Sequence, residues 1–578
     1  MRFFLLFLPI LLLCRCASKH QPLAHSPYFY SAPEDTLPPS VLAEMAELES
    51  QEEDLNAFQK KRLFDLYQIE KKNLKDSSAR AKWIDERLEK LKSDVEPLMI
   101  KGSVEPSIES EELSQGPKEK FKFSVPDLKR PFQQAHDAWN RDDNEEALSL
   151  IEKLMDSELY QKKAETPDRN RILNLYFRAA LDSGNFEKCQ KAYEKIKQES
   201  DCSKEAAQTG FLLALLNFSS GKIGEGKNII VQQCDPDQSI ANRTRRAYWL
   251  FRMSEENSSE QQKYYEELSA FPLPGYYMYL AERHKGRDLK LPNRTDFQFG
   301  NFTVSSKNDE LIRSAEDRIR FGLRKDAVRL LQRVQRDLLT DPQKNQRALL
   351  YVSRLFQAAG NHLEAMKTIN ALLTGEGEEE NRDAFSNDSE LVSEFMNLYH
   401  KPFLNEVQWL GTAWGVDPDF IYSIMRQESA FNPGAVSVAG ARGLMQLMPT
   451  LSKFLLEQWR APVPKSRSYM FRGSENIKLA TYHLNQLNQL AGHPALIAAS
   501  YNAGVYRVSS WWRRAGHYPL DLFVELIPVN ETRNYVKLVL RNFIYYKGLR
   551  NDGTVPKELI ALQLPEAPAA IRSMSGSP

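Results

Sequence analysis

Residues 416–429 read VDPDFIYSIMRQES. Asp417 has the side chain of a good helix N-cap, and Pro418 follows at the first helical position, where proline is well tolerated. Between residues 420 and 425 the apolar side chains recur at i, i+3 and i+4, which is the spacing of one helical face. The stretch therefore predicts an amphipathic helix that begins at Pro418 and ends before the FNPG run of residues 431–434.

Glu428 lies four residues after Ile424, on the same apolar face, in the last turn of this helix. Apolar burial and the negative end of the helix dipole both favour the neutral form of a carboxyl group. A pKa raised by about two units would leave a protonated acid near neutral pH, as a general acid acting on a glycosidic oxygen requires. A buried, hydrogen-bonded structural residue is the other interpretation, and the following residues decide between the two.

Three blocks follow in order along the chain. The first is ESAFNP at 428–433 with GARGLMQLMPT at 440–450, the second is AASYNAG at 498–504, and the third is FVELIP at 523–528 with ETRNYV at 531–536. Together they resemble the signature of the SLT family of lytic transglycosylases, and the helical repeats in front of them make the large soluble type the most similar. The resemblance is specific over about 401–550, whereas residues 18–127 match no family.

The resemblance implies a role for each matching residue. Glu428 corresponds to the catalytic acid/base of the family, and Tyr501 to the tyrosine that faces this acid. The substrate-binding positions implied along the groove are Ser437, Gln446, Met448, Tyr501, Asn502 and Glu531. Gly440, Gly443 and Gly504 are interpreted as backbone requirements, and at least one of Trp511 and Trp512 as core.

The predicted chemistry needs one carboxylic acid and neither a metal nor an organic cofactor. No acidic residue lies between Glu428 and Glu457, which argues against the usual pair of carboxylates. As the family implies, Glu428 would cleave the β-1,4 bond from N-acetylmuramic acid to N-acetylglucosamine and leave a 1,6-anhydro end. Two alternatives stay open: a goose-lysozyme-like hydrolase with Glu531 as second carboxylate, and a catalytically silent peptidoglycan-binding scaffold. The other acidic candidates for a second carboxylate are Glu475, Asp521 and Glu525.

Upstream of this region, a Gly/Asn-type turn followed by an amphipathic helix recurs between residues 128 and 373. Steps between the turn residues Asn144, Asn185, Lys222, Lys325 and Asn361 are 41, 37, 103 and 36 residues, and 103 is close to three missing units. Helical hairpins at this period stack into an α-solenoid similar to tetratricopeptide arrays. The aromatic loop at 271–277 could bind a ligand or, more in keeping with a repeat, pack between hairpins.

The predicted fold class is all-α: an α-superhelix of hairpins followed by a lysozyme-like helical catalytic domain. The predicted segments are a signal peptide at 1–17, a tether and helical N-terminal segment at 18–127, the superhelix at 128–374, an acidic linker at 375–395, the catalytic domain at 396–550 and a C-terminal tail at 551–578.

The amino terminus has an apolar run after Arg2 that is too short to span a bilayer, which is typical of a secretory signal peptide. Cys14 and Cys16 are both candidates for lipid attachment, and neither follows the usual small residues, so lipidation stays open. The remaining cysteines, Cys189, Cys202 and Cys234, allow one bridge, with Cys189–Cys202 the pair closest in sequence, or buried thiols.

The chain has 578 residues and a formal net charge of zero, from 77 basic and 77 acidic residues. Residues 401–550 carry 17 Lys and Arg against 9 Asp and Glu, a local surplus of 8. The overall balance argues against a nucleic-acid binder. We expect peptidoglycan strands as the partner, other cell-wall enzymes as further partners of the superhelix, and membrane contact only through a lipid at Cys14 or Cys16. The expected location is the periplasm of a Gram-negative bacterium, with or without an outer-membrane anchor.

Overall fold

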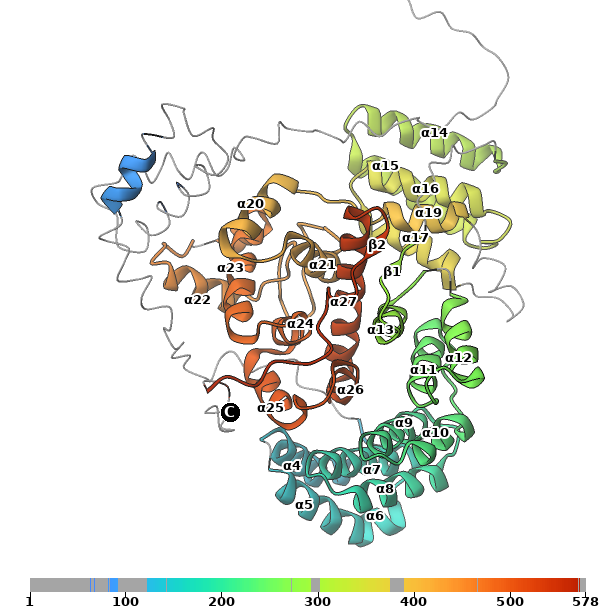
Figure 1. The fold of residues 1–578 in the computed structure, drawn as a ribbon. Helices are drawn as coiled ribbons and strands as arrows, with labels where there is room; N and C mark the ends of the chain where they lie inside the picture. The colour runs from blue at the N-terminus through green and yellow to red at the C-terminus, as the bar shows by residue number, and fades with distance from the viewer. Residues whose placement is uncertain are drawn as a thin grey trace, which may run out of the picture. The chain divides into compact units, whose positions relative to one another are not determined.

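The computed structural model describes residues 63, 67, 82, 84–91, 122–141, 143–271, 273–292, 302–374, 389–464, 466–569 and 571. Helices make up almost all of the regular structure in these ranges, which confirms the predicted all-α fold class (Figure 1). The described residues fall into two compact units. One lies within Arg294–Phe395, and the other joins Ala32–Asn293 to Met396–Pro578. The predicted signal peptide and most of the predicted N-terminal segment at 18–127 lie outside the described residues.

The first part of the larger unit is a series of helical hairpins. Paired helices α4 with α5, α7 with α8, α9 with α10 and α11 with α12 pack on each other along the chain. The elements are η2 (Pro126–Leu128), α4 (Lys129–Asn140), α5 (Asn144–Asp156), α6 (Glu158–Lys163), α7 (Thr166–Asp182), α8 (Phe186–Glu199), α9 (Lys204–Ser219), α10 (Ile223–Gln232), α11 (Ile240–Arg252), α12 (Ser259–Ser269), α13 (Tyr276–His284) and β1 (Leu289–Lys290).

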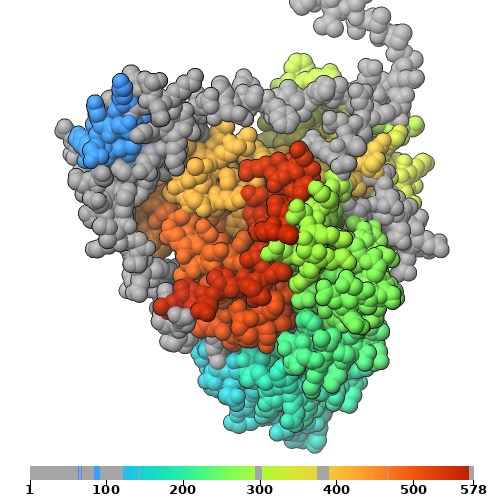
Figure 2. Space-filling view, viewed as in Figure 1, coloured from blue at the N-terminus to red at the C-terminus, as the bar shows by residue number. Residues whose placement is uncertain are grey.

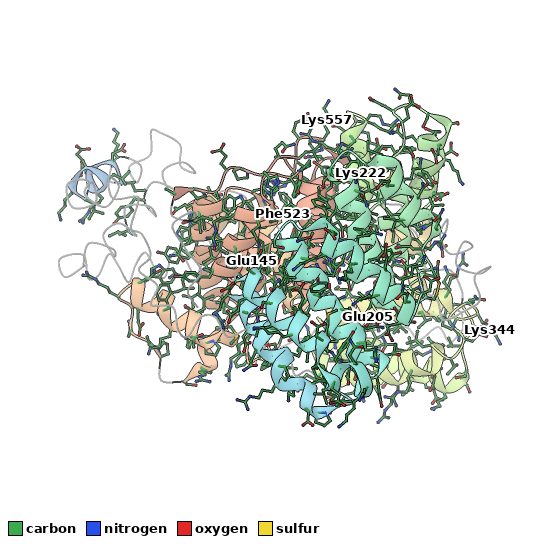
Figure 3. The ribbon with its side chains drawn as sticks, turned by 90° about the horizontal axis from the view of Figure 1, so that it is seen from below. Glu145, Glu205, Lys222, Lys344, Phe523 and Lys557 are labelled. Carbon is green, nitrogen blue, oxygen red and sulfur yellow. A yellow bond between two sulfur atoms is a disulfide. The ribbon has the colours of Figure 1, made fainter. Side chains whose placement is uncertain are left out.

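The second helices α5, α8 and α10 begin where the repeat pattern predicts. Asn185 caps α8, its side chain accepting a hydrogen bond from the Lys188 N–H at 3.0 Å. The preceding Gly184 has a φ of +71°, a conformation that glycine adopts without strain. Glu145 and Lys222, labelled in Figure 3, lie at the starts of α5 and α10. The side chains of Asp143 and Asn185 therefore cap the starts of α5 and α8, whereas α10 begins after Lys222 without a side-chain cap.

The three further units expected between Lys222 and Lys325 are not found in the described residues. After α10, this stretch contains one hairpin, α11 with α12. It is followed by α13, which packs on the later helix α27 (Asn530–Arg550), and by α14 (Ser306–Arg320), which pairs with α15 (Arg324–Leu338). Tyr276 and Tyr277 of the aromatic loop are buried, but the Tyr277 hydroxyl bonds to Glu525 of the predicted catalytic region, so the loop does not pack only between hairpins as the repeat pattern favoured. The prediction was wrong because α13 packs on α11 and α12 and also on α27, and forms no hairpin of its own among the described residues.

The second part of the larger unit carries the predicted catalytic region. Its elements are α20 (Leu404–Trp414), α21 (Pro418–Ser429), α22 (Pro449–Gln458), η4 (Arg467–Phe471), α23 (Gly473–Ala491), α24 (Pro494–Ala503), α25 (Val505–Ala515), α26 (Leu520–Leu526), α27 (Asn530–Arg550) and β2 (Thr554–Val555). Helix α27 packs on both α21 and α24. Trp511 and Trp512 are buried in this core, and Phe523, labelled in Figure 3, is 1% exposed.

The segment expected to be a C-terminal tail packs on the unit instead. Strand β2 pairs antiparallel with β1, with Val555 opposite Leu289, and Figure 2 shows these two parts of the chain side by side. The Trp512 indole N–H donates to the Pro565 carbonyl at 2.9 Å. His493 lies 3.0 Å from the Ala561 carbonyl and is used structurally. Paired backbone and buried side chains therefore hold residues up to about 565 in place.

The smaller unit consists of α14 (Ser306–Arg320), α15 (Arg324–Leu338), α16 (Gln346–Ala358), α17 (His362–Thr374) and all but the last two residues of α19 (Ser389–Asn397). Helix α19 begins inside the predicted linker at 375–395, so the linker prediction was wrong over its last seven residues. Apolar Leu391 is fully buried, and Glu394 is buried in an ion pair with Arg354 at 2.7 Å. These contacts attach α19 to the hairpins. Residues 375–388 lie outside the described ranges.

In the part of the chain that the structure describes, no helix combines the length and the apolar character needed to cross a membrane.

Cys202 and Cys234 form a disulfide, whereas Cys189 is a buried free thiol in α8. The pairing suggested by sequence proximity, Cys189–Cys202, was wrong. Helices α9 and α10 fold back on each other, which brings the start of one beside the end of the other. The bridge therefore closes this hairpin across 32 residues.

We expect Cys234→Ser to lower the free energy of unfolding by about 2–4 kcal/mol, because the bridge restricts the unfolded chain. Denaturant unfolding with and without dithiothreitol measures the effect. The reductant should destabilise the wild type to the level of the variant and leave the variant unchanged. Cys189→Ala, the control, should stay sensitive to the reductant. A wild-type protein whose free energy of unfolding is the same with and without dithiothreitol would contradict the presence of the bridge.

Candidate active site

Helix α21 follows its sequence prediction closely. The Asp417 carboxylate accepts a hydrogen bond from the Asp419 N–H at 2.9 Å, and Pro418 is the first helical residue. Glu428 lies in the last turn. The next residues, Ala430 and Phe431, both have positive φ, at 48° and 64°. Non-glycine residues adopt this conformation at an energetic cost, and such strain clusters at functional sites.

The Glu428 carboxyl group is bonded to a tyrosine from α27. Tyr535, 7% exposed, donates its hydroxyl to Glu428 Oε1 at 2.5 Å. Burial of the carboxyl group raises the pKa of Glu428 to about 7; the Tyr535 hydrogen bond opposes the rise, and the charge of Glu531 adds to it. The sequence predicted a raised pKa for Glu428, and burial is the largest cause of the rise. Near neutral pH the carboxyl group is a mixture of acid and carboxylate, as proton transfer in both directions requires.

Tyr501, the tyrosine expected to face the acid, lies close to it but bonds elsewhere. Its hydroxyl donates to the Met445 carbonyl at 2.7 Å. Burial, and then the charge of Glu428, hold the pKa of Tyr501 well above its usual range, so it stays a neutral donor. The tyrosine that contacts the acid is therefore Tyr535, which the sequence did not assign. One signal was available: Tyr535 follows Glu531 by four residues, on the same helical face.

The loop between α21 and α22 is held by Asn476 of α23. The Asn476 amide donates to the carbonyls of Met470 at 2.9 Å and Arg442 at 3.0 Å, and its oxygen accepts from the Met445 N–H at 2.8 Å. Gly443 has a φ of +80°, and a Cβ atom there would lie 2.2 Å from the Met470 carbonyl oxygen. Glycine at this position is therefore a backbone requirement, as predicted.

Three of the predicted groove residues lie on this same loop. Ser437 Oγ accepts from the Ala441 N–H at 3.0 Å, and the Gln446 amide donates to the carbonyls of Ala435 at 3.1 Å and Gly443 at 2.8 Å. Met448 precedes α22 and is partly exposed. These hydrogen bonds shape the loop; contact of the three residues with a sugar stays a prediction.

Asn502 and Glu531, the other two predicted positions, lie where α24 meets α27. The Thr532 hydroxyl donates to Asn502 Oδ1 at 2.7 Å, and the neighbouring Glu531 is exposed. Among the acidic candidates for a second carboxylate, Asp521 and Glu525 are buried in ion pairs with other helices. Glu531 is the candidate whose charge acts on Glu428.

The raised pKa predicts a pH-dependent stabilisation by Glu428→Gln. Ionisation is harder in the folded state, with a pKa of about 7, than at the ordinary value of 4.5, so the wild type loses stability as pH rises between them. At about 1.4 kcal/mol per pKa unit, the stability gained by the variant should grow by about 2–3 kcal/mol between pH 4.5 and 8. Urea unfolding of both proteins tests this, and a difference independent of pH would contradict the raised pKa.

Comparisons with known proteins match the region that contains this site. The family model described as transglycosylase SLT domain matches residues 407–523. A putative soluble lytic murein transglycosylase of Haemophilus influenzae is 46% identical over 157 residues, which are 27% of this chain and 26% of that protein. The soluble lytic murein transglycosylase of Escherichia coli K12 is 37% identical over 139 residues, 24% of this chain and 22% of that protein. The matches thus span about a quarter of these relatives.

Among solved structures, the fold is similar to that of an inactive variant of the lytic transglycosylase Slt from Pseudomonas aeruginosa. The TM-score is 0.55 at 20% identity, covering 92% of this chain and 79% of that one. This likeness concerns the all-helical fold and extends beyond the region matched in sequence. Residues 407–523, which contain Glu428 and Tyr501, form a transglycosylase SLT domain.

Proposed function

We propose that this chain is a peptidoglycan lytic transglycosylase with Glu428 as its single general acid and base. The observation that carries the proposal is a partly buried carboxyl group with a pKa of about 7, bonded to Tyr535, within the region that matches the SLT family. The substrate is the glycan strand, cleaved between N-acetylmuramic acid and N-acetylglucosamine. The product is a 1,6-anhydro-muramic acid end.

Protonated Glu428 gives its proton to the glycosidic oxygen as the bond from that oxygen to C1 of muramic acid breaks. The substrate's own acetamide oxygen stabilises the positive charge that develops at C1. Ionised Glu428, held by the Tyr535 hydroxyl, then takes the proton of the C6 hydroxyl while O6 bonds to C1. The acid is regenerated, and no water enters the product. Proton transfer by a positioned group contributes about 10²- to 10⁴-fold to the rate.

The hydrolase alternative, with Glu531 as the second carboxylate, would yield a free hemiacetal at C1. The relatives matched here are named lytic transglycosylases, so the comparisons do not favour the hydrolase alternative. Borohydride reduction separates the two outcomes, because it adds two hydrogens to a hemiacetal and leaves an anhydro end unchanged. We expect fragments released from purified sacculi to resist reduction. Fully reducible fragments would overturn the proposal, and no fragments at all would favour a silent binding protein.

We further propose that the protein works in the periplasm of a Gram-negative bacterium, where its substrate lies. The apolar start of the sequence and the Cys202–Cys234 bridge, typical of an oxidising compartment, support export. Anchoring through Cys14 or Cys16 is tested by fractionating cells that express Cys14→Ser and Cys16→Ser. Contacts of the superhelix with other cell-wall enzymes stay a prediction.

Tyr535→Phe should shift the pH dependence of activity toward alkaline pH. The Tyr535 hydroxyl stabilises the carboxylate and so lowers the pKa of Glu428; without it the pKa rises, and the protonated acid persists to higher pH. We expect the alkaline limb of kcat/KM for fragment release to move upward by about half a unit to one unit. A downward move, or none, would contradict this role of Tyr535.

A further inference from the structure

Helix α27 presents two different faces to its surroundings. Glu531 and Tyr535 lie four residues apart on the face toward the acid, whereas Arg533 and Lys537 are offset from them by two residues. At 100° per residue this offset places the second pair on nearly the opposite side of the helix. The orientation of this second face therefore sets where Tyr535 points.

The second face is bound to a buried carboxylate. Lys537 Nζ lies 2.8 Å from Glu525 Oε1 of α26, and Glu525 is 1% exposed. Arg533 donates to the Ile527 carbonyl at 2.8 Å, which fastens the start of α27 to the end of α26. These contacts fix both the rotation of α27 and its position along its axis.

The superhelical part contributes a second hydrogen-bond partner to this carboxylate. Tyr277 of α13 donates its hydroxyl to the same Glu525 Oε1 atom and is 7% exposed. Burial and then the charge of Glu525 hold the pKa of Tyr277 well above its usual range, so it stays a donor. Burial alone would raise the pKa of Glu525, but the charges of Lys537, Arg245 and Arg533 outweigh it and lower that pKa, which keeps Glu525 ionised.

We propose that Tyr277 is a positioning residue for the catalytic acid: by fixing Glu525 it holds Lys537, and with it α27, where Tyr535 reaches Glu428. This proposal rests on the proposed role of Glu428. The Tyr535–Glu428 bond, at 2.5 Å, is sensitive to small displacements of α27, because hydrogen bonds weaken steeply as distance and angle depart from the optimum. Helix α13, more than 100 residues upstream of Glu428, thereby helps to position the catalytic carboxyl group.

The test compares Tyr277→Phe with Tyr279→Phe. Tyr279 lies on the same helix and is fully buried, but its hydroxyl bonds to the backbone of residues 557 and 560. We expect Tyr277→Phe to move the alkaline limb of kcat/KM upward by several tenths of a pH unit and Tyr279→Phe to leave it in place. The ionisable groups around the acid, namely Tyr501, Tyr535 and Glu531, are the same in both variants.

A double variant makes the test specific. If Tyr277 acts through Tyr535, adding Tyr277→Phe to Tyr535→Phe should produce no further shift, whereas independent effects would add. An additive shift, or a Tyr277→Phe profile that coincides with the wild type, would overturn the proposal. If Tyr277→Phe does not fold, Lys537→Met breaks the same chain of contacts and should give the same alkaline shift; no shift would again overturn it.

The pKa of Glu428 can also be measured without turnover. The stability difference that Glu428→Gln produces, followed over pH with and without Tyr277→Phe in the same chain, reports this pKa directly. A higher pKa in a protein that releases no fragments would overturn the proposed function and support the positioning role. An unchanged pKa of Glu428 in an enzyme that does release fragments would overturn the positioning role of Tyr277 and support the proposed function.

Discussion

Glu428→Gln reduces fragment release from sacculi by at least about 10²- to 10⁴-fold, because the amide can neither give a proton to the glycosidic oxygen nor take one from the C6 hydroxyl. The substitution keeps the size of the side chain and an acceptor for the Tyr535 hydroxyl, so we expect the fold and the predicted substrate-binding groove to persist. Binding to sacculi, measured by co-sedimentation, should stay within about twofold of the wild type. Soluble fragments quantified by chromatography give the rate.

Glu475→Gln is the matched control. Glu475 lies in the same domain, in the first turn of α23, and is exposed. Its substitution should leave release unchanged. If Glu428→Gln retained the wild-type rate, or if both variants lost activity equally, Glu428 would not be the catalytic acid.

Among substitutions that break an ion pair of the larger unit, Asp521→Asn should lower the free energy of unfolding the most. Asp521 is 2% exposed and lies 3.0 Å from Arg252 Nε, and it accepts the Tyr248 hydroxyl at 2.6 Å. Burial alone would raise its pKa, but the hydrogen bond from His284 and the charge of Arg252 hold it well below the usual range. Asparagine would leave Arg252 without its charge partner, at a cost of about 3–5 kcal/mol.

Because the pKa of Asp521 is depressed, its contribution to stability is complete above the unfolded-state pKa of about 4 and is lost as pH falls below it. Urea unfolding at pH 7 therefore shows the full difference. The control is Glu158→Gln, which removes an exposed pair with Lys162 and should change stability by no more than about 1 kcal/mol. Equal effects of the two substitutions would contradict a stabilising role for the Asp521 cluster.

The position of Glu428 was predictable because every signal for it is local. Asp417, Pro418 and the apolar spacing that follows define one helix, and the carboxyl group's place on its buried face follows from counting residues. The hairpin starts were predictable for the same reason, since a capping side chain and a glycine in a left-handed turn need no distant partner. Such features depend on neighbouring residues alone and not on contacts with distant parts of the chain.

The features that sequence reasoning missed all depend on packing between distant segments. Tyr535 lies 107 residues from Glu428, and their contact exists only because α27 packs on α21. Helix α13 resembles half of a repeat, yet its tyrosines are buried toward α26 and α27. The disulfide joins Cys202 to Cys234 because a hairpin turns between them. No local pattern encodes these pairings.

The most direct test of the central claim is the reaction carried out in water enriched in ¹⁸O, with the released fragments analysed by mass spectrometry. A transglycosylase closes the ring with the sugar's own C6 oxygen, so we expect anhydro ends one water lighter than hydrolysis products and without ¹⁸O. Fragments that are one water heavier and carry a solvent oxygen at C1 would contradict single-residue catalysis by Glu428 and establish hydrolysis instead.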